Sequence, residues 1–408
     1  MLLPEELFAN TDQNRFITTG GTREHGVITR VTSLADSGPG TLREAIETVK
    51  TANVIVFEVG GEIELEEDIF IRKSQVTIAG QTAPSPGITL SGASLRVRAS
   101  DVAIEHISFR PGLEAEPAER ADGLTIGGGS REVKRIRLRN ISVSWSRDEL
   151  TAVADPTDGP VSITHSIFAE ALRDAGHPKG RHSMGLLVRD APRGVTIAGN
   201  LFVSNAHRNP VLGSDVRALV KNNWIVNPRF NAMHVYLDDH PENMVAFFEN
   251  NVMTPGQDTF EETRPLNLQS PDELAGTGAT LISTDNTVLM PDDMAAIDFD
   301  SPGPAARADA NIGTKAVPSH VVQFAGARPL DRNPTDRRII EDVFAGSSAI
   351  VDVPPEDVVL PSSKGVVVPP EDAFALTERG NTRVEVWLEE LHLELGGVAG
   401  FEFEPLNG

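Results

Sequence analysis

The chain of 408 residues has no cysteine, few aromatic residues and no long apolar run. Without cysteine it can form no disulfide bond, thiolate metal site or thiol nucleophile. No segment reaches the roughly 18–20 uninterrupted apolar residues that span a bilayer. Residues 1–10 lack the basic and apolar segments of an export signal. We therefore expect a soluble protein with no membrane partner and no export signal within this chain.

Positive charge is also in short supply. Lysine and arginine number 36 against 59 aspartates and glutamates, so the formal net charge is −23 at pH 7. Such a charge repels nucleic acid and anionic lipid at long range, and we expect neither as a partner. It would repel a polyanionic sugar as well. A protein of this charge that acts on an acidic polymer needs a bound metal ion or a local basic groove.

The sequence does contain a repeated β-type phrase. Its 35 glycines and 28 prolines are too many for a helical bundle, and its 39% of hydrophobic residues are too many for a disordered chain. Short runs with alternating apolar positions begin at Val76, Val102, Ile136, Val161, Val195, Ala218 and Val245. Successive starts are 26, 34, 25, 34, 23 and 27 residues apart, which indicates a coil of about 25 residues with insertions.

Side chains also recur at fixed offsets within this repeat. Apolar groups follow several runs, at Ile107 to Phe109, Ile167-Phe168, Leu201-Phe202 and Trp224-Ile225. Three asparagines each come three residues after a run, at Asn200, Asn223 and Asn250. In a right-handed, single-stranded parallel β-helix, equivalent positions stack about 4.8 Å apart and such residues form ladders. We predict this all-β solenoid, and a β-sandwich is the alternative.

The ends of such a solenoid need covers, because terminal coils expose strand edges and core. Thr41, followed by the apolar spacing of residues 42–46, predicts a helical cap at the N-terminal end. Beyond about Thr254 the repeat gives way to segments rich in Asp, Pro and Gly, with helical patterns at 336–343 and 385–391. We therefore divide the chain into a β-helix domain at 1–260 and a long, irregular C-terminal extension at 261–408 that packs on the solenoid.

Acidic residues lie about one coil apart in the middle of the repeat. Asp122 precedes a predicted strand, Asp148 and Glu149 come one coil later, and Asp155 follows. Carboxylates on neighbouring coils can meet in space, and hard oxygen donors without His or Cys suit Ca²⁺. We interpret Asp122, Asp148 and Glu149 as calcium ligands. In a chain with 59 acidic residues, separate surface acids are the alternative.

A basic cluster falls in one of the two long intervals of the repeat. The segment 177–183 contains Lys179, Arg181 and His182, which predicts a functional loop inserted over a flank of the solenoid. A plain solvated loop is the alternative.

A second basic cluster, at residues 207–210, follows the next coil. It contains His207 and Arg208, and the proline at 210 restricts the backbone beside the arginine. A structural ion pair between Arg208 and Asp215 is the alternative to a functional role.

Together these segments resemble the pectate lyases of polysaccharide lyase family 1, in particular the bacterial branch with a long C-terminal extension. The phrases that carry the resemblance are residues 31–43, 78–84, 101–111, 144–149, 182–185, 208–210, 326–332 and 336–342. They extend over most of the chain, and their order and spacing make the likeness specific. The resemblance implies a parallel β-helix that cleaves an acidic polysaccharide, most directly pectate, by Ca²⁺-assisted β-elimination to 4,5-unsaturated products.

The resemblance also implies roles in the metal site and in catalysis. Asp122 and Asp148 match metal ligands, while the second position of the family's Asp-x-x-x-Asp pair falls on Ala152, so Glu149 would substitute. Arg208 matches the catalytic arginine and would be the base. His182 is the second candidate for the base, because an imidazole titrates near neutral pH.

Substrate-binding residues follow from the same comparison. The lysine of a family His-x-Lys motif falls on Met184, and Lys179 or Arg181 would restore its charge. His207 and Arg217 complete the predicted substrate-binding set. Since a polymeric substrate lies outside the cell, we expect a secreted or periplasmic protein, and we expect a monomer.

Two other functions stay open. A β-helix glycoside hydrolase of the polygalacturonase type needs paired aspartates in its groove. The Asp-Asp pairs of this chain are at 238–239 and 292–293, in or past the last coils. A non-catalytic carbohydrate-binding β-helix protein would carry the acidic cluster merely as surface.

Overall fold

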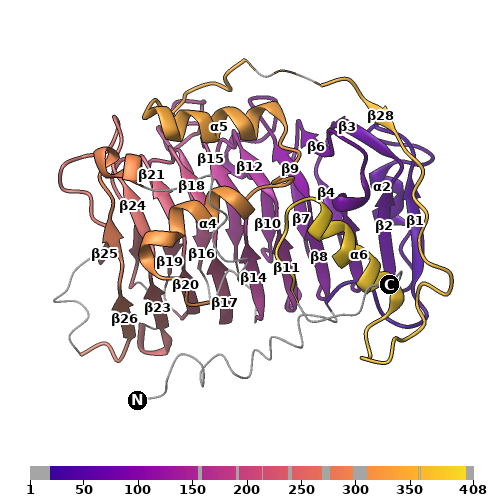
Figure 1. Cartoon of the computed structure of the whole chain (residues 1–408). Coiled ribbons are helices and arrows are strands. Elements are labelled where there is room, and N and C mark those ends of the chain that lie inside the picture. The colour runs from indigo at the N-terminus through magenta and orange to yellow at the C-terminus, as the bar shows by residue number, and fades with distance from the viewer. Residues whose placement is uncertain are drawn as a thin grey trace.

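Three sheets of mostly parallel strands form the walls of a solenoid (Figure 1). The computed structural model describes residues 19–154, 159–189, 193–213, 215–237, 241–268, 276–296, 310–356, 358 and 360–400. The chain visits the three walls in turn, so each strand pairs with the strand one coil earlier and one coil later. This arrangement is a parallel β-helix, and it confirms the predicted fold class.

The three walls are a first, a second and a third sheet. The first sheet contains β1 (Val27–Val31), β2 (Asn53–Phe57), β5 (Val76–Ala79), β8 (Val102–Glu105), β11 (Ile136–Arg139), β14 (Val161–Thr164), β17 (Arg193–Ala198), β20 (Arg217–Lys221), β23 (Val245–Glu249) and β26 (Thr280–Thr284). The second contains β4 (Ile69–Ile71), β7 (Leu95–Val97), β10 (Leu124–Ile126), β13 (Glu149–Val153), β16 (Met184–Val188), β19 (Val211–Leu212), β22 (Met233–Val235) and β25 (Leu266–Leu268). The third contains β3 (Val59–Glu64), β6 (Ile88–Ser91), β9 (Ile107–Arg110), β12 (Ser142–Ser144), β15 (Ile167–Ala169), β18 (Leu201–Val203), β21 (Trp224–Val226), β24 (Val252–Thr254), β27 (Thr287–Val288) and the antiparallel β28 (Ser363–Lys364).

The repeated phrase of the sequence forms the first sheet. Six of its seven predicted starts share one register position on successive strands, namely Val76, Val102, Ile136, Val161, Val195 and Ala218. All six side chains are buried in the central core. Apolar residues stacked in this way exclude water from the interior along the whole solenoid.

The seventh copy is displaced by one residue from its predicted position. Ala246, and not Val245, pairs with Ala218. The asparagine that continues the ladder is correspondingly Asn251, and not Asn250. Asn250 instead donates to Asn222 at a neighbouring position.

A ladder of buried asparagines supports the bend between the first and third sheets. Nδ2 of Asn200 donates to Oδ1 of Asn223 over 3.0 Å, and Nδ2 of Asn223 donates to Oδ1 of Asn251 over 2.9 Å. Asn286 extends the ladder by one coil. The Asn223 side chain also accepts the Asn200 N–H and donates to the Ile197 carbonyl. Because these buried amides are satisfied, they fix the same bend on consecutive coils.

Alternate residues of the third sheet face opposite sides. Inside the solenoid, Phe168 and Phe202 stack with ring centroids 5.1 Å apart. Trp224 faces outward, where the C-terminal helices α4 (Val317–Phe324) and α5 (Pro334–Ala345) cover it. The helix predicted at 336–343 is therefore present, and it packs along the solenoid (Figure 1).

The predicted N-terminal cap is also present. Helix α2 (Leu42–Glu47) begins after Thr41, whose hydroxyl accepts the N–H of Glu44 over 3.2 Å. Leu42 and Ile46 bury their side chains in the central core at the first coils. Between the elements lie the short 3-10 turns η2 (Gly80–Thr82), η3 (Ala118–Arg120), η4 (Pro241–Asn243), η5 (Pro291–Ala296) and η6 (Thr314–Ala316).

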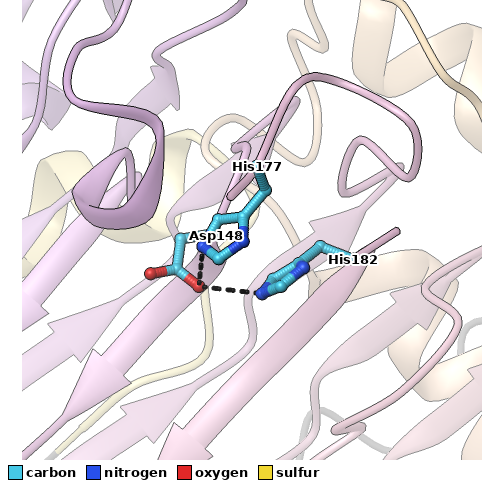
Figure 2. Close-up of side chains that lie close together, drawn as sticks. All are labelled: Asp148, His177 and His182. Carbon is cyan, nitrogen blue, oxygen red and sulfur yellow. Dashed lines mark ion pairs between the residues drawn. The ribbon is translucent and has the colours of Figure 1, made fainter. Parts of the chain in front are cut away.

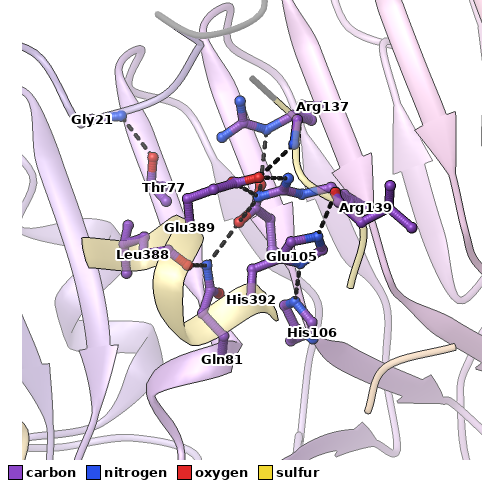
Figure 3. A network of polar contacts seen from close by, with 12 residues as sticks. Gly21, Thr77, Gln81, Glu105, His106, Arg137, Arg139, Leu388, Glu389 and His392 are labelled. Carbon is purple, nitrogen blue, oxygen red and sulfur yellow. Dashed lines mark hydrogen bonds and ion pairs between the residues drawn. The ribbon is translucent and has the colours of Figure 1, made fainter. Parts of the chain in front are cut away.

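The last helix, α6 (Arg383–Glu394), lies on the outer face of the first sheet through a buried polar network (Figure 3). Arg139 pairs with Glu389 of this helix at 2.8 Å and with Glu105 of the sheet at 3.1 Å. Burial favours the protonated acid, yet the guanidiniums of Arg139 and Arg137 hold the pKa of Glu105 far below its usual value. Removing one partner would leave a buried charge uncompensated, at a cost of roughly 3–5 kcal/mol.

The solenoid extends further along the chain than predicted. Strands β25, β26 and β27 form its last coil beyond residue 260, where the C-terminal extension was expected to begin. The division into two domains stays a prediction. Over the residues that the structure covers, none of the helices combines the length and apolar character that crossing a membrane requires.

Candidate active site

The turns that lead from the third sheet into the second carry the polar residues of the site. On successive coils these turns precede β10, β13, β16 and β19. Asp122 precedes β10, Asp148 immediately precedes β13, Glu149 begins β13, and Arg208 precedes β19. Because neighbouring strands lie about 4.8 Å apart, residues on equivalent turns come into contact.

A shared backbone step aligns these turns. Trp145, Glu170 and Ser204 each follow a strand of the third sheet and adopt left-handed conformations, with φ of 63°, 57° and 53°. Their main chains also pair from coil to coil, since Trp145 N–H donates to the Glu170 carbonyl over 3.2 Å. The same change of direction at the same point of each coil brings the following side chains to one wall.

Asp122, Asp148 and Glu149 converge, with one carboxylate oxygen of each within 4.8 Å of the others. Asp122 is buried; its Oδ1 accepts the N–H of Glu149 over 3.1 Å, and its Oδ2 accepts the Thr125 hydroxyl over 2.7 Å. Glu149 is buried too, whereas Asp148 is partly exposed. The structure thus brings the three predicted metal ligands together.

The electrostatics of this acidic trio suit a cation. Burial, and then the neighbouring Asp148 carboxylate, raise the pKa of Asp122 to about 7. Burial also raises the pKa of Asp148, although His177 opposes the shift. The two carboxylates resist ionisation because burial disfavours their charged forms. A bound cation would favour those forms. Their hard oxygen donors fit Ca²⁺, which takes six to eight oxygens and would leave positions for water or an anionic ligand.

Arg208 lies against the acidic trio. Its guanidinium pairs with Glu149 and hydrogen-bonds the Tyr236 hydroxyl. Burial lowers the pKa of Arg208, while Tyr236, Asp148 and Asp122 oppose that shift. The Arg208 backbone is left-handed, with φ of 64°, which is uncommon for a residue with a long side chain. An unusual backbone that presents a partly buried guanidinium to acids is typical of a functional position.

Two histidines from the loop between β15 and β16 flank Asp148 (Figure 2). Nε2 of His182 and Nε2 of His177 lie 3.6 Å and 3.7 Å from Asp148 Oδ1. The two rings pack together with centroids 3.4 Å apart. Burial and the adjacent His182 lower the pKa of His177, against the pull of Asp148. The main-chain N–H of His182 donates to the Arg173 carbonyl over 2.7 Å, and this bond fixes the end of the loop beside the acids.

Two further imidazoles lie beside Arg208. His207 stacks on Phe230, with ring centroids 4.5 Å apart. Burial lowers the pKa of His207 to about 4 and that of His234 to about 3. Both rings are therefore uncharged at neutral pH and add no positive charge to the wall.

Comparison with known proteins gives this geometry a context. No family model matches the chain. A protein named probable pectate lyase C from Aspergillus terreus is 37% identical over 202 residues, or 49% of this chain and 44% of that protein. Its namesake from Emericella nidulans is 36% identical over 44% of this chain and 39% of that protein. Another, from Aspergillus flavus, is 28% identical over 78% of this chain and 73% of that protein. The chain thus spans less than half the length of the first two relatives.

Solved structures extend the likeness to the fold. The major allergen from cedar pollen superposes with a TM-score of 0.53 at 20% identity, over 78% of this chain and 97% of that chain. A Bacillus subtilis pectate lyase mutant superposes with a TM-score of 0.52 at 14% identity, over 76% and 94% of the two chains. This chain shares the parallel β-helix fold of these proteins and is similar in part of its sequence to proteins named probable pectate lyase C. At these identities the structural likeness concerns the fold alone.

At Ala152, where the resemblance implies a metal-binding aspartate, the chain offers no oxygen ligand. Ala152 is buried on β13, in register with Thr125 on one side and Leu187 on the other. Glu149, three residues earlier, is the residue that supplies the further carboxylate. Asp155 lies outside the described residues.

The predicted substrate-binding residues are distributed unevenly around this site. Lys179 is exposed, and its charge acts on Asp148. Arg181 instead pairs with Asp174 at 3.2 Å, on the exposed surface of the loop. Arg217 is exposed at the start of β20, on the first sheet and so on a different wall. The structure brings Lys179 to the site and directs Arg181 and Arg217 elsewhere.

Three residues of the site were not assigned from the sequence. His177 was recognised only as part of a loop, and His234 and Tyr236 were not recognised at all. Tyr236 is the single tyrosine of the chain. His234 and Tyr236 are two residues apart where β22 ends, one coil after Arg208. Alternation along a strand puts such a pair on one face, which is the signal that could have found them.

Proposed function

We propose that this pectate lyase-like protein is an extracellular polysaccharide lyase that cleaves a polyuronate, most directly pectate, by calcium-assisted β-elimination. One observation carries the proposal: Arg208 lies against the acidic trio of Asp122, Asp148 and Glu149 on a single wall. The relatives named probable pectate lyase C support the same substrate class.

The chemistry explains why such a site needs both acids and a cation. The reaction removes the C5 proton of a uronate, turns that electron pair into a C4–C5 double bond, and expels the C4 oxygen with its bonding pair. An ionised carboxylate beside C5 makes the proton very weakly acidic, because charge would accumulate next to charge. Calcium, when bound, neutralises the substrate carboxylate and stabilises the charge that develops on it. Asp122, Asp148 and Glu149 would hold the ion and so recruit a polyanion to a protein of charge −23.

Arg208 is our first choice for the base that takes the C5 proton. A guanidinium is ordinarily protonated, but burial lowers the pKa of Arg208. The Tyr236 hydroxyl hydrogen-bonds this guanidinium and so orients it. Glu149 holds the guanidinium by an ion pair in the present arrangement. Drawing Glu149 toward a cation would release the guanidinium toward the substrate.

His182 is the second choice for the base. Its Nδ1 faces the Gly180 carbonyl at 3.1 Å, and a carbonyl can only accept. The proton of a neutral His182 ring therefore sits on Nδ1, and Nε2 presents a free electron pair toward Asp148. Lys179 and His207 would contact the substrate next to these groups, and secretion and a monomeric state belong to the same proposal.

The hydrolase alternative gains no support from Asp292-Asp293, the Asp-Asp pair that lies within the described residues. Asp292 and Asp293 lie in η5, exposed and far along the last coil, and the pair at 238–239 lies outside the described residues.

The test is a panel of pectate, methylated pectin, alginate and other uronans, each with calcium and with a chelator. Elimination creates a conjugated double bond, so ultraviolet absorbance distinguishes it from hydrolysis. We expect absorbance to rise on pectate with calcium only. Reducing ends without absorbance would favour a hydrolase, and no product from any uronan would favour a binding protein.

A matched pair of variants then tests the base. Arg208→Lys keeps a positive charge but loses the guanidinium, and we expect turnover to fall by about 10²-fold or more. Arg337→Lys makes the same change at an exposed position of α5 and should leave turnover unchanged. Undiminished turnover of Arg208→Lys would exclude Arg208 and leave His182→Gln as the next variant to measure.

A further inference from the structure

We propose that His177, His182 and Asp148 form a second metal site, which binds a divalent transition ion of the zinc class. The site is distinct in chemistry from the acidic trio, since it combines two imidazoles with one carboxylate. The proposal does not depend on the lyase activity.

The donor atoms are already close to the spacing of a coordination sphere. Asp148 Oδ1 lies 3.6 Å from His182 Nε2 and 3.7 Å from His177 Nε2, and the three atoms lie within 4.8 Å of one another (Figure 2). Zinc bonds to nitrogen and oxygen measure about 2.0–2.2 Å, so tetrahedral donors lie about 3.4 Å apart. The two distances to Asp148 are therefore within a few tenths of an ångström of this spacing, whereas the stacked rings of His177 and His182, with centroids 3.4 Å apart, would have to separate around an ion.

His182 is arranged as a metal ligand. Its Nδ1 is held by the Gly180 carbonyl, which fixes the ring and leaves the Nε2 electron pair directed at Asp148. Histidines that bind metals commonly donate their second ring N–H to a carbonyl in this way. Two groups with electron pairs, an imidazole nitrogen and a carboxylate oxygen, face each other and need a proton or a cation between them.

His177 supplies the independent observation. Its side chain is 1% exposed, and its Nε2 is buried without a hydrogen-bond partner while pointing toward Asp148. A buried polar atom without a partner is rare and costly, and an ion would satisfy this nitrogen once the ring proton has moved to Nδ1. The partly exposed Asp148 leaves an open side for water or another ligand, as in zinc sites with three protein ligands.

Loading this site requires one local change. The Lys179 N–H now donates to His177 Nδ1 over 3.1 Å, which places the His177 proton on Nε2. Binding through Nε2 moves that proton to Nδ1, so the Lys179 amide must turn away. The Lys179 side chain is exposed, so it is not packed in the protein interior when its amide turns.

The donor set selects the class of ion. Imidazole nitrogen favours Zn²⁺, Co²⁺, Ni²⁺ and Cu²⁺, whereas Ca²⁺ and Mg²⁺ prefer oxygen alone. We therefore expect calcium to bind at the acidic trio and zinc to bind at His177, His182 and Asp148.

The test uses metal-stripped full-length protein titrated with Co²⁺, whose visible absorption reports nitrogen and oxygen ligands, followed by displacement with Zn²⁺. We expect one Co²⁺ per chain in this site. His177→Gln and His182→Gln should each weaken Co²⁺ binding at least tenfold, while the exposed-histidine control His25→Asn leaves it unchanged. Circular dichroism establishes that each variant is folded.

A second measurement on the unaltered protein keeps the proposal falsifiable if a variant does not fold. Zn²⁺ should shift the ring nitrogen signals of His177 and His182, and the amide signal of Lys179, in nitrogen-15 NMR spectra. Absence of Co²⁺ binding at millimolar metal would overturn the proposal. So would Co²⁺ binding that responds to Glu149→Gln and not to either histidine variant, because the ion would then lie in the acidic trio.

Discussion

Replacing Asp122 by asparagine should make the metal-free protein more stable at alkaline pH while removing its response to calcium. Asp122 is buried beside Asp148, and its pKa is raised from 3.8 to about 7. Holding this carboxylate ionised above that pH costs the folded state about 4 kcal/mol. Asparagine keeps the shape and can still accept the Glu149 N–H. The hydrogen bond from the Thr125 hydroxyl to the ionised carboxylate is already included in the pKa of about 7. The expected net gain at pH 8 is therefore about 4 kcal/mol.

The pH dependence gives this prediction its sign. Between pH 4 and 7 the folded protein binds a proton at Asp122 that the unfolded chain releases. The free energy of unfolding of the metal-free protein therefore falls as pH rises through this window. The variant lacks this slope, so the two proteins should match near pH 4 and diverge toward pH 8. Guanidinium denaturation in chelator measures the difference, and added calcium should stabilise only the unaltered protein.

Asp101→Asn is the matched control because it should have the opposite effect. Asp101 is as buried as Asp122, but it accepts two bonds from Arg135, at 2.6 Å and 2.7 Å, and one from Arg23 at 2.6 Å. Neutralising it leaves two arginines without their acid, and stability should fall by roughly 1–3 kcal/mol. A loss of stability in Asp122→Asn at pH 8, or a difference that does not change with pH, would refute the view of Asp122 as a repelled charge.

Three further predictions concern the ladder, the base and the two metal sites. Asn223→Ala removes four side-chain hydrogen bonds from the middle of the asparagine ladder and should lower the free energy of unfolding by about 3–4 kcal/mol in denaturant titration. Asn286→Ala, at the partly exposed end of the ladder, should lower it by about 1 kcal/mol. Equal losses in the two variants would contradict a stabilising role of the ladder. Tyr236→Phe should lower turnover about tenfold with little change in thermal stability, since it frees the Arg208 guanidinium; unchanged kinetics would remove Tyr236 from the site. Calcium should weaken Co²⁺ binding because both sites use Asp148, and calorimetric titrations with and without calcium would show independent binding if that sharing is wrong.

The pairing register of the first sheet was predictable from the sequence as far as β20. At β23 the residues fit two registers, one residue apart, equally well. Val161 and Val195 alternate with polar neighbours, so only one frame buries them. At β23 the run from Val245 to Phe248 is apolar throughout, and both Asn250 and Asn251 follow it. Either frame fills the core and either amide reaches the bend. Pairing with the preceding coil decides the register, and that information is not local.

The acidic trio was predictable for the same reason that the early coils were, since Asp122 and Glu149 occupy equivalent turns. His177 was not predictable as a contact of Asp148. Its loop is placed by distant groups: the Arg173 N–H donates to the Val351 carbonyl, and Arg147 donates to the Ala175 carbonyl. A loop whose shape depends on a segment about 180 residues away cannot be built from its own sequence.

The C-terminal extension has a consequence for how this protein can change in size. It contacts the coil of β15 through the pair of Arg338 and Glu170, returns to the first coils at β28, and ends at Arg139 through Glu389 (Figure 1). Repeat proteins ordinarily gain or lose units by duplication and deletion. Here an added or deleted coil between these anchor points would shift one anchor by about 4.8 Å relative to another. The C-terminal extension therefore fixes the number of coils between its contact points. Sequence change in this part of the solenoid is then confined to the loops.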